Sequence, residues 1–569
     1  MTADDATLAL LSSLSEPGDG AAIPDVSPHE VLKDQPSADA SAYALRLIRS
    51  AHEPAAPAVA SPSSAPASAH AASEAPGVKV KPTTRLYKHF RTACDLIHCD
   101  GRAYAVPRET TELVGPAGVA IPLEPFRRIV TRVARRVPDV GGISQTMARD
   151  VVAELEADAY AGPASRVDLR IHHDPAAGRI VIDLARPDGL AIVVTAQGWT
   201  VEPIPMGVVF RRSHATLPLP DPVRGGRLDE LAAILSLDPV GVPFASLSAW
   251  AVGTLFAASV RPAVLLWGPM GCGKTTALRV VASTVEPTPA SAMGSAFGRN
   301  LDDDLVRATH RALPIWDNLQ RVSGAVSEQF CSMVTGTAIE KRQLYTDTEL
   351  VSVAVARPVG LTAVAKPAGF RPDALDRMTV VEMQPLPVRI ADDAIQARFD
   401  EAHPRLLGAL CDAAAAALRW MPYTPAPTHL RMAAHAHVLA AIDAATAAGE
   451  LVGVPAGLLA TYADLAGHTS RDTAAEDVFG GALLALLEES GGAWSGKASE
   501  LLAAAGRHVM LGVHGAGWPG SPRKVPEALA YLRPGLAEIG VTWQRTTVRS
   551  KTRYSFATAP IAATDGVAL

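Results

Sequence analysis

The residues with the clearest chemistry lie at positions 268–275, which read G-x-x-x-x-G-K-T. The apolar run "PAVLLWG" leads into them and a helical pattern follows, and this context favours a phosphate-binding loop over a chance glycine-rich turn. Glycines let backbone N–H groups turn towards a phosphate, and the start of the helix adds partial positive charge. We expect Lys274 to face solvent until it binds phosphate, and the Thr275 hydroxyl to bind Mg²⁺. The predicted cofactors are ATP and Mg²⁺, and the predicted loop residues are Gly268, Pro269, Met270, Gly271, Cys272, Gly273, Lys274, Thr275 and Thr276.

A second apolar run, "ALPIW", ends in Asp317 and Asn318. Asp317 is the expected second ligand of Mg²⁺, and the alternative is a strand-end Asp that caps the next helix. Enzymes that hydrolyse nucleotides usually have Glu where Asn318 stands. Asn cannot accept a proton near neutral pH, but it can orient a water molecule, and phosphoryl transfer depends mainly on positioning and charge neutralisation. We therefore predict that hydrolysis persists, with Glu328 as a weaker candidate base.

Bulk composition limits the class of protein. The chain has 569 residues, enough for about three or four domains of ~150 residues. Its net charge of −6 means that any nucleic-acid surface must be local. The five cysteines are too few and too scattered for a disulfide framework. The sequence has no secretory leader and no uncharged apolar run of about 18 residues, so we expect a cytoplasmic protein without a membrane partner.

The elements that must position the loop and Asp317 lie in the segment 261–387. Its apolar strands are separated by stretches long enough for crossover helices, which predicts an α/β fold with a parallel sheet. The other predicted segments are 1–83 (Ala/Pro/Ser-rich, disordered), 84–225 (an α+β domain, helical first and strand-rich later), 226–260 (a helical lead-in), 388–470 (helical), 471–560 (winged-helix-like) and 561–569 (a tail).

A hairpin is predicted after the Asp317 strand, with arms "AIEKRQLY" and "ELVSVAV" around the turn "TDTE". Lys341 and Arg342 on its first arm are candidate DNA contacts, although a solvated strand face explains them almost as well. The next strand, "RPVGLTAV", ends near Thr362, and Arg371 and Arg377 precede a further apolar strand.

This order of parts resembles the helicase domains of the superfamily III and AAA+ type in phage, plasmid and integrative-element replication proteins, which are often fused to or paired with primases. "RQLYTDTE" resembles a stretch in bacterial ATP-binding proteins from such elements, and "GRAYAVPR" and "WPGSPRKV" extend a fainter resemblance to both flanks. The resemblance implies a P-loop NTPase core, a hexamer-type ring of identical subunits, and a primase or replication initiator as partner. It also implies that Thr362 stands where the group usually has a sensor Asn, and that Arg377 is an arginine finger that reaches the neighbouring subunit's γ-phosphate. The alternative for Arg377 is an ordinary surface arginine.

The last hundred residues have the pattern helix, helix, helix, hairpin, which predicts a winged-helix region whose third helix begins at Ser521 and Pro522. Alternation predicts cations on the wing and the aromatic residues Trp543, Tyr554 and Phe556 beneath it. The alternative is a structural domain that mediates subunit contacts. The candidate DNA-binding residues here are Arg523, Lys524, Arg545, Arg549, Lys551 and Arg553.

The leading hypothesis is therefore a Mg-ATP-dependent DNA motor, a helicase for replication of a phage-like or mobile element. An ATP-gated DNA-binding switch with little turnover is the main alternative, and a small-molecule kinase is a weaker third. Two clusters contain residue types that can bind a metal, but we interpret both as structural residues and not as metal sites. They are His89, Cys94, His98 and Cys99, and Asp168, His172, His173 and Asp183.

Overall fold

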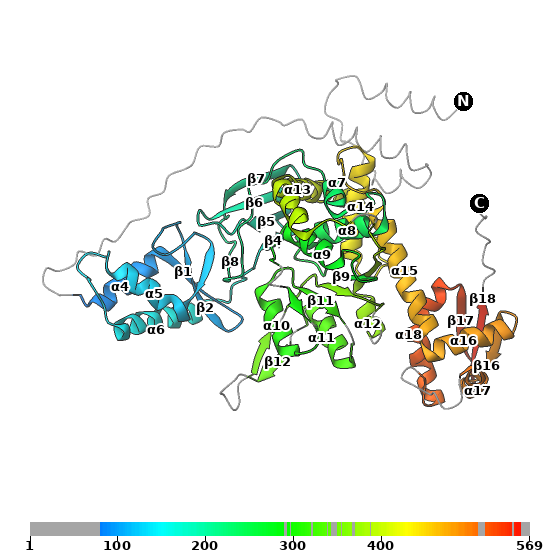
Figure 1. Cartoon of the computed structure of the whole chain (residues 1–569). Coiled ribbons are helices and arrows are strands. Elements are labelled where there is room, and N and C mark those ends of the chain that lie inside the picture. The colour runs from blue at the N-terminus through cyan, green and yellow to red at the C-terminus, as the bar shows by residue number, and fades with distance from the viewer. Residues whose placement is uncertain are drawn as a thin grey trace, which may run out of the picture. The chain divides into compact units, whose positions relative to one another are not determined.

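The computed structural model describes residues 80–289, 293–295, 297–319, 322–337, 339–342, 350–353, 355–366, 370–386, 389–509, 518–548 and 551–558. Several predictions fall outside these residues. They concern the prediction of disorder for the part of segment 1–83 up to residue 79, the hairpin turn, Arg549 and the tail at 561–569. Figure 1 shows the order of the described elements along the chain.

Three helices and a small sheet form the first part of the described chain (Figure 1). The helices are α4 (Pro82–Ala93), α5 (Leu123–Ala134) and α6 (Gln145–Ala161), and they bury Leu86, Phe90 and Phe126 in one core. The sheet has the order β1-β2-β3-β8, with β1 (Cys94–Cys99), β2 (Arg102–Pro107), β3 (Val119–Pro122) and β8 (Phe210–Arg211). Strands begin at Cys94, earlier than the sequence pattern indicated, so Cys94, His98 and Cys99 lie on a strand and not on a helix. Cys94 is buried, and His98 Nε2 lies 3.0 Å from the carbonyl oxygen of Gly162.

A second sheet is an antiparallel meander of β4 (Ile171–Asp174), β5 (Arg179–Asp183), β6 (Leu190–Thr195) and β7 (Gly198–Pro203). Asp174 Oδ1 accepts a hydrogen bond from the backbone of Ala177 at 3.1 Å, so "DPAAG" is the hairpin turn that the sequence predicts. His172 Nδ1 lies 2.7 Å from Asp168 Oδ2, and the buried Asp183 pairs with Arg212 at 2.6 Å. These side chains therefore have partners within the protein fold.

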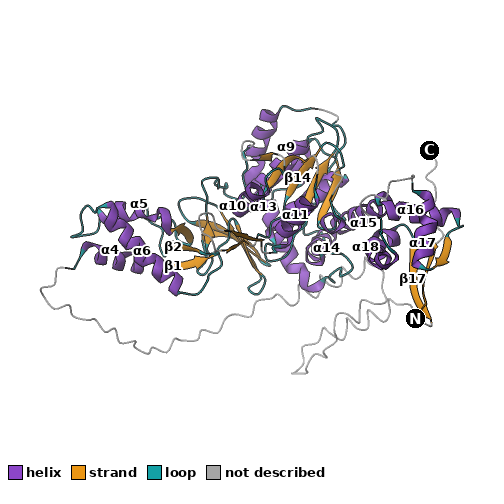
Figure 2. Ribbon diagram, turned by 90° about the horizontal axis from the view of Figure 1, so that it is seen from below, coloured by secondary structure: helices purple, strands orange, loops and turns teal. Residues whose placement is uncertain are grey.

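The central sheet is parallel throughout, as predicted, with the strand order β10-β11-β14-β9-β15. Its helix α9 packs against β9, β11 and β14, and Figure 2 shows α9 beside the strands of this sheet. The predicted hairpin is present as the antiparallel pair β12 (Ile339–Arg342) and β13 (Leu350–Val353). The strands of the sheet are β9 (Ala263–Trp267), β10 (Gly294–Ser295), β11 (Ile315–Leu319), β14 (Gly360–Ala363) and β15 (Met378–Glu382). The helices around them are α7 (Asp229–Leu235), α8 (Val242–Leu255), α9 (Lys274–Ser283), α10 (Leu301–His310), α11 (Gly324–Thr335) and α12 (Pro372–Leu375).

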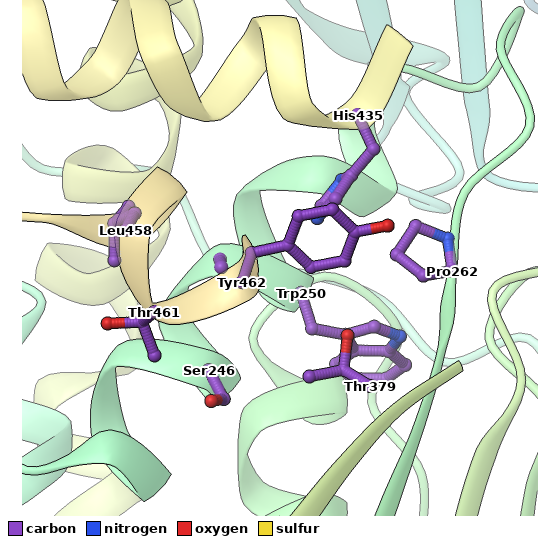
Figure 3. A pocket seen from close by; sticks show the side chains of 9 residues that line it. Ser246, Trp250, Pro262, Thr379, His435, Leu458, Thr461 and Tyr462 are labelled. Atoms are coloured by element: carbon purple, nitrogen blue, oxygen red, sulfur yellow. The ribbon is translucent and has the colours of Figure 1, made fainter. Parts of the chain in front are cut away.

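The segment after the sheet is helical, with α13 (Asp392–Trp420), η2 (Met421–Tyr423), α14 (Ala433–Ala447) and α15 (Leu458–Glu476). Among the described helices, none has the length and apolar character that crossing a membrane requires. A small pocket lies where α8, α14 and α15 meet β15 (Figure 3). His435 and Tyr462 pack edge to face there, with ring centroids 5.1 Å apart. His435 Nδ1 and the indole N–H of Trp250 are buried and have no hydrogen-bond partner among the described residues.

The last described part consists of α16 (Val478–Glu489), α17 (Ala498–Ala505), α18 (Val525–Glu538) and a three-stranded sheet of order β16-β18-β17. Its strands are β16 (Ala493–Gly496), β17 (Val541–Val548) and β18 (Lys551–Thr558), and short 3₁₀ turns lie at η3 (Gly506–His508) and η4 (Pro522–Lys524). Strand β16 was not predicted. The α-helix of the predicted third helix begins at Val525, because Pro522 opens a 3₁₀ turn instead.

Candidate functional site

Three strands deliver the predicted nucleotide-site residues to one edge of the central sheet. Gly268 follows β9, Asp317 lies near the end of β11, and Thr362 near the end of β14. These strands are neighbours in the order β11-β14-β9 and run parallel, so their carboxyl ends share an edge. In open α/β sheets, ligands bind at this edge.

The loop between β9 and α9 has a backbone that only glycine adopts easily. Gly268, Gly271 and Gly273 have φ values of 150°, 80° and 78°. A Cβ atom at Gly268 would lie 2.3 Å from the carbonyl oxygen of Met383, so the close passage of these two segments also requires glycine. This geometry is typical of a loop that turns N–H groups towards an anion at a helix start.

Lys274 is buried, with 8% of its surface exposed, so the prediction that it faces solvent is wrong. Its Nζ donates to the carbonyl oxygens of Gly268 at 2.8 Å and Pro269 at 2.7 Å, and it lies 3.4 Å from Cys272 Sγ. An ammonium group has three donors, and all three are directed into the loop. A phosphate that binds Lys274 must therefore replace at least one of these contacts.

Asp317 joins the loop to the sheet. Its Oδ1 accepts a hydrogen bond from the Thr275 hydroxyl at 2.6 Å and another from the Thr362 hydroxyl at 2.5 Å. Thr362 is buried, with 1% exposure, whereas Asp317 is only partly buried. The structure thus brings together three residues that are 42 and 45 positions apart in the chain.

Asn318 occupies a β-bulge. Trp316 pairs with Leu361 and Leu319 with Ala363, so Asp317 and Asn318 together lie opposite the single residue Thr362. The φ of Asn318 is 58°, in the left-handed region that Asn tolerates better than most residues. Its backbone N–H donates to Thr362 Oγ1 at 3.0 Å, and its side chain is exposed. Bulges often redirect a side chain beside an active site, and here the bulge leaves the amide accessible.

Sequence reasoning missed the outer wall of the site. A pocket beside the loop is lined by Lys274, Thr275 and Thr276 and by residues from two distant segments. The Thr276 hydroxyl donates to Asp392 Oδ1 at 3.1 Å, and a Cβ at Gly271 would lie 2.9 Å from the Arg389 guanidinium. No local pattern marks these residues, because their role depends on tertiary contact alone. The distant lining residues are Leu235, Leu386, Arg389, Ile390, Asp392 and Ile395.

The donor set fits Mg²⁺ held together with phosphate. Mg²⁺ prefers oxygen ligands and is usually bound by one or two carboxylates plus substrate phosphates. Thr275 and Asp317 supply a hydroxyl and a carboxylate 2.6 Å apart beside the loop. Among the described residues no group of three or more His, Cys, Asp or Glu side chains is arranged to hold a metal by itself. A metal here would therefore depend on the nucleotide for its other ligands.

Arg377 lies away from the glycine-rich loop of the same chain. Its backbone carbonyl accepts a hydrogen bond from the N–H of Ala263 at the start of β9, five residues before Gly268, which is about 17 Å along a strand. Its side chain is 16% exposed and bonds to the carbonyl oxygen of Asp373, with Cys331 Sγ at 3.6 Å. Arg371, on the same stretch, is 56% exposed. Glu328 is exposed on α11, as a helical surface residue is.

The candidate DNA contacts are only partly described. Lys341 and Arg342 lie in β12 and Lys551 in β18, but the structure does not describe these side chains. Arg545 and Arg553 are exposed on β17 and β18, and Arg523 and Lys524 are exposed in η4.

Alternation does not separate the wing cations from the aromatic residues as predicted. Arg545 pairs with Tyr554 and therefore shares its face of the sheet, while Arg553 lies on the other face. The reason is that Trp543 and Arg545 are two residues apart on β17, so alternation along the strand places both on one face.

Two stretches of the chain match family models. Residues 242–464 match the model of the "Actinomycete integrative conjugative element replication protein", and residues 479–562 match the "AICE RepA C-terminal domain". The first stretch contains the whole parallel sheet, and the second runs from α16 to β18. These matches agree with the resemblance to integrative-element replication proteins, whereas the superfamily III assignment stays a prediction.

Two solved structures show looser likeness. The structure titled "SCCmec type IV Cch - active helicase" has a TM-score of 0.41 at 12% identity and covers 80% of this chain and 90% of that chain. An apo structure of the NrS-1 C-terminal region has a TM-score of 0.37 at 8% identity and covers 84% of this chain and 100% of that chain. Both TM-scores are too low for these likenesses to support a conclusion. No curated protein matches the chain.

Proposed function

We propose that this chain is a Mg-ATP-dependent DNA motor, a helicase that acts in replication of an integrative or phage-like element. The observation that carries the proposal is the joint contact of Thr275, Asp317 and Thr362 beside the glycine-rich loop. The family matches support a role in replication. The central segment is then a P-loop NTPase core, and the segment after α15 is a winged-helix region that contacts DNA.

In this proposal Lys274 and the loop N–H groups hold the phosphates, and Thr275 and Asp317 hold Mg²⁺. The metal would neutralise charge on the transferred phosphoryl group. The apolar residues Leu235, Ile390 and Ile395 offer a wall for the base. Asn318 orients the attacking water through its exposed amide, and Thr362 fixes the bulge that presents it.

Arg377 acts in trans in this proposal. Its place at the start of β9, at the other end of the strand from the loop, favours service to the neighbouring subunit of a hexamer-type ring over a role in the site of its own chain. The contacts with Asp373 hold the guanidinium until the neighbour arrives. A primase or a replication initiator is the proposed partner that loads the ring.

A second candidate is an ATP-gated DNA-binding switch that turns over slowly. Asn318 favours it, because no carboxylate follows Asp317 to act as a base. ATP hydrolysis with and without single-stranded DNA, on protein whose assembly is measured by mass photometry, separates the two. DNA-stimulated turnover by a ring supports the motor. Nucleotide-dependent assembly and DNA binding without stimulated turnover would support the switch instead.

A further inference from the structure

Helix α5 and the two residues that follow it carry a row of arginines that the proposed nucleotide site does not use. Buried Phe126, Val130 and Val133 anchor the opposite side of the helix in the core. At about 100° per residue the arginines fall on one half of the helix circumference, away from that core. All are exposed, and they are Arg127, Arg128, Arg132, Arg135 and Arg136.

These arginines are not paired with acidic side chains among the residues that the structure describes. Within the described part of the chain none of the five forms an ion pair, and the one side-chain hydrogen bond runs from Arg132 to the carbonyl oxygen of Leu113. Neighbouring arginines of the same segment do find partners, since Arg85 pairs with Asp139 at 2.9 Å and Arg108 with Asp95 at 2.8 Å. Glu124, in the first turn of α5, is the acidic residue nearest to the row along the helix, and among the described residues it forms no ion pair with these arginines. The row is thus a local excess of positive charge in a chain whose net charge is −6.

Local structure does not explain the row. Cations near a helix C-terminus interact well with the helix dipole, which accounts for Arg132 in the last turn and for Arg135 and Arg136 just beyond it. It does not account for Arg127 and Arg128 in the middle of α5. Arg128 and Arg132 are also four residues apart, where like charges destabilise a helix. A polyanion bound along the row would remove this repulsion.

We propose that the row on α5 binds the phosphate backbone of DNA, so that the segment before the parallel sheet is a second DNA contact besides the C-terminal strands. The inference takes DNA as the polyanion from the proposed function. One guanidinium group can donate two parallel N–H hydrogen bonds to a phosphate group. A row of arginines on one face therefore suits a chain of regularly spaced phosphates. Contacts to phosphate carry no sequence information, so this contact is independent of sequence.

The test is a triple variant, Arg128→Gln with Arg132→Gln and Arg135→Gln. DNA affinity is measured without nucleotide by fluorescence anisotropy of labelled single-stranded DNA, at salt concentrations from about 50 to 200 mM. Loss of three phosphate contacts should make the negative slope of log affinity against log salt shallower by about 2. It should also weaken DNA binding at least about tenfold. The matching Arg→Lys triple should keep the wild-type slope, because charge is retained.

The matched control is Arg85→Gln with Arg91→Gln and Arg108→Gln, which removes the same charge from arginines already paired with Asp139, Asp158 and Asp95. The proposal is overturned if the α5 triple binds DNA like this control. Circular dichroism verifies folding of each variant. ATP affinity should be unchanged in the α5 triple variant. If the DNA-binding prediction for α5 fails, the proposed nucleotide site is therefore not affected. If the proposed nucleotide site is wrong, this DNA-binding measurement is still valid, because it is made without nucleotide.

Discussion

The Thr362 hydroxyl donates to Asp317 Oδ1 at 2.5 Å and accepts from the Asn318 backbone N–H at 3.0 Å. One buried side chain on β14 therefore orders both residues at the end of β11. Any chemistry that depends on the direction of the Asp317 carboxylate or the Asn318 amide depends on this threonine.

Thr362→Val keeps the shape of the side chain and removes both hydrogen bonds. A hydrogen bond to a charged group is worth about 1.5–3 kcal/mol, so we expect kcat for ATP hydrolysis to fall about 10- to 150-fold. ATP affinity should change little, because Thr362 does not line the nucleotide pocket. Steady-state turnover and binding of a fluorescent ATP analogue measure the two effects. Thr362→Ser, which retains the hydroxyl, should keep most activity, and an equally slow Ser variant would contradict a role for these bonds.

Asn318 can be tested in a way that separates its amide from its backbone. Asn318→Gly accepts the φ of 58° and removes the amide, so turnover should fall about 10- to 1,000-fold if the amide positions water. Turnover in Asn318→Ala should fall at least as far, because Ala at this φ adds backbone strain of about 1 kcal/mol. Asn318→Glu restores the usual base and should keep or raise the turnover rate. The same backbone strain would reduce that gain. Wild-type turnover in the Gly variant would show that the amide is not the water-positioning group.

Lys274→Ala should abolish ATP binding. The change also removes the donor to the Gly268 and Pro269 carbonyl oxygens, so a small drop in melting temperature is expected as well. Isothermal titration with Mg-ATP and a thermal melt measure both. Met270→Ala is the matched control, since this residue sits in the same loop with 82% of its surface exposed and should bind ATP normally. Unchanged affinity in a folded Lys274→Ala protein would refute the site.

Arg377→Ala and Asp317→Ala should each stop turnover, the latter at any Mg²⁺ concentration. An equal mixture of the two should recover part of the activity, because an intact site can borrow Arg377 from a neighbouring Asp317→Ala subunit. ATPase assays on mixtures whose co-assembly is verified by mass photometry measure this recovery. Arg371→Ala is the comparison, as Arg371 is the more exposed arginine on the same stretch. An active Arg377→Ala protein with an inactive Arg371→Ala protein would move the role to Arg371.

Acid should destabilise the protein through His435. Burial lowers the pKa of His435 to about 3, whereas an unfolded His has a pKa of about 6.5. Between these values the unfolded chain binds a proton that the folded chain does not, so stability is full above pH 6.5 and falls as the pH drops towards 3. At pH 5 the loss is about 2 kcal/mol.

Thermal melts at pH 7.5 and pH 5 measure this loss. His435→Gln should reduce the difference between the two melting temperatures, while His429→Gln, at an exposed position, should not. Buried His173, whose pKa is lowered to about 4 by burial, contributes in the same direction, so the difference should shrink and not vanish. If the difference in melting temperature between the two pH values is as large in His435→Gln as in the wild type, His435 is not a source of the acid sensitivity.

The sequence by itself determined the features that depend on contiguous residues. The glycine-rich loop needs only a strand, three glycines and a helix start in succession, so its position and backbone geometry follow from residues 263–283. The Asp317 strand, the β12–β13 hairpin and the parallel sheet follow in the same way from short apolar runs and their spacing.

Tertiary structure decided how distant segments meet. The register between β11 and β14 creates the bulge, gives Asn318 its left-handed backbone and sets Thr362 against Asp317. The fold buries Lys274 among loop carbonyl groups, and it brings Leu235 and Arg389 beside the loop. No local pattern encodes these contacts, because a shift of one residue in strand pairing would reverse every side chain while leaving the sequence periodicity unchanged.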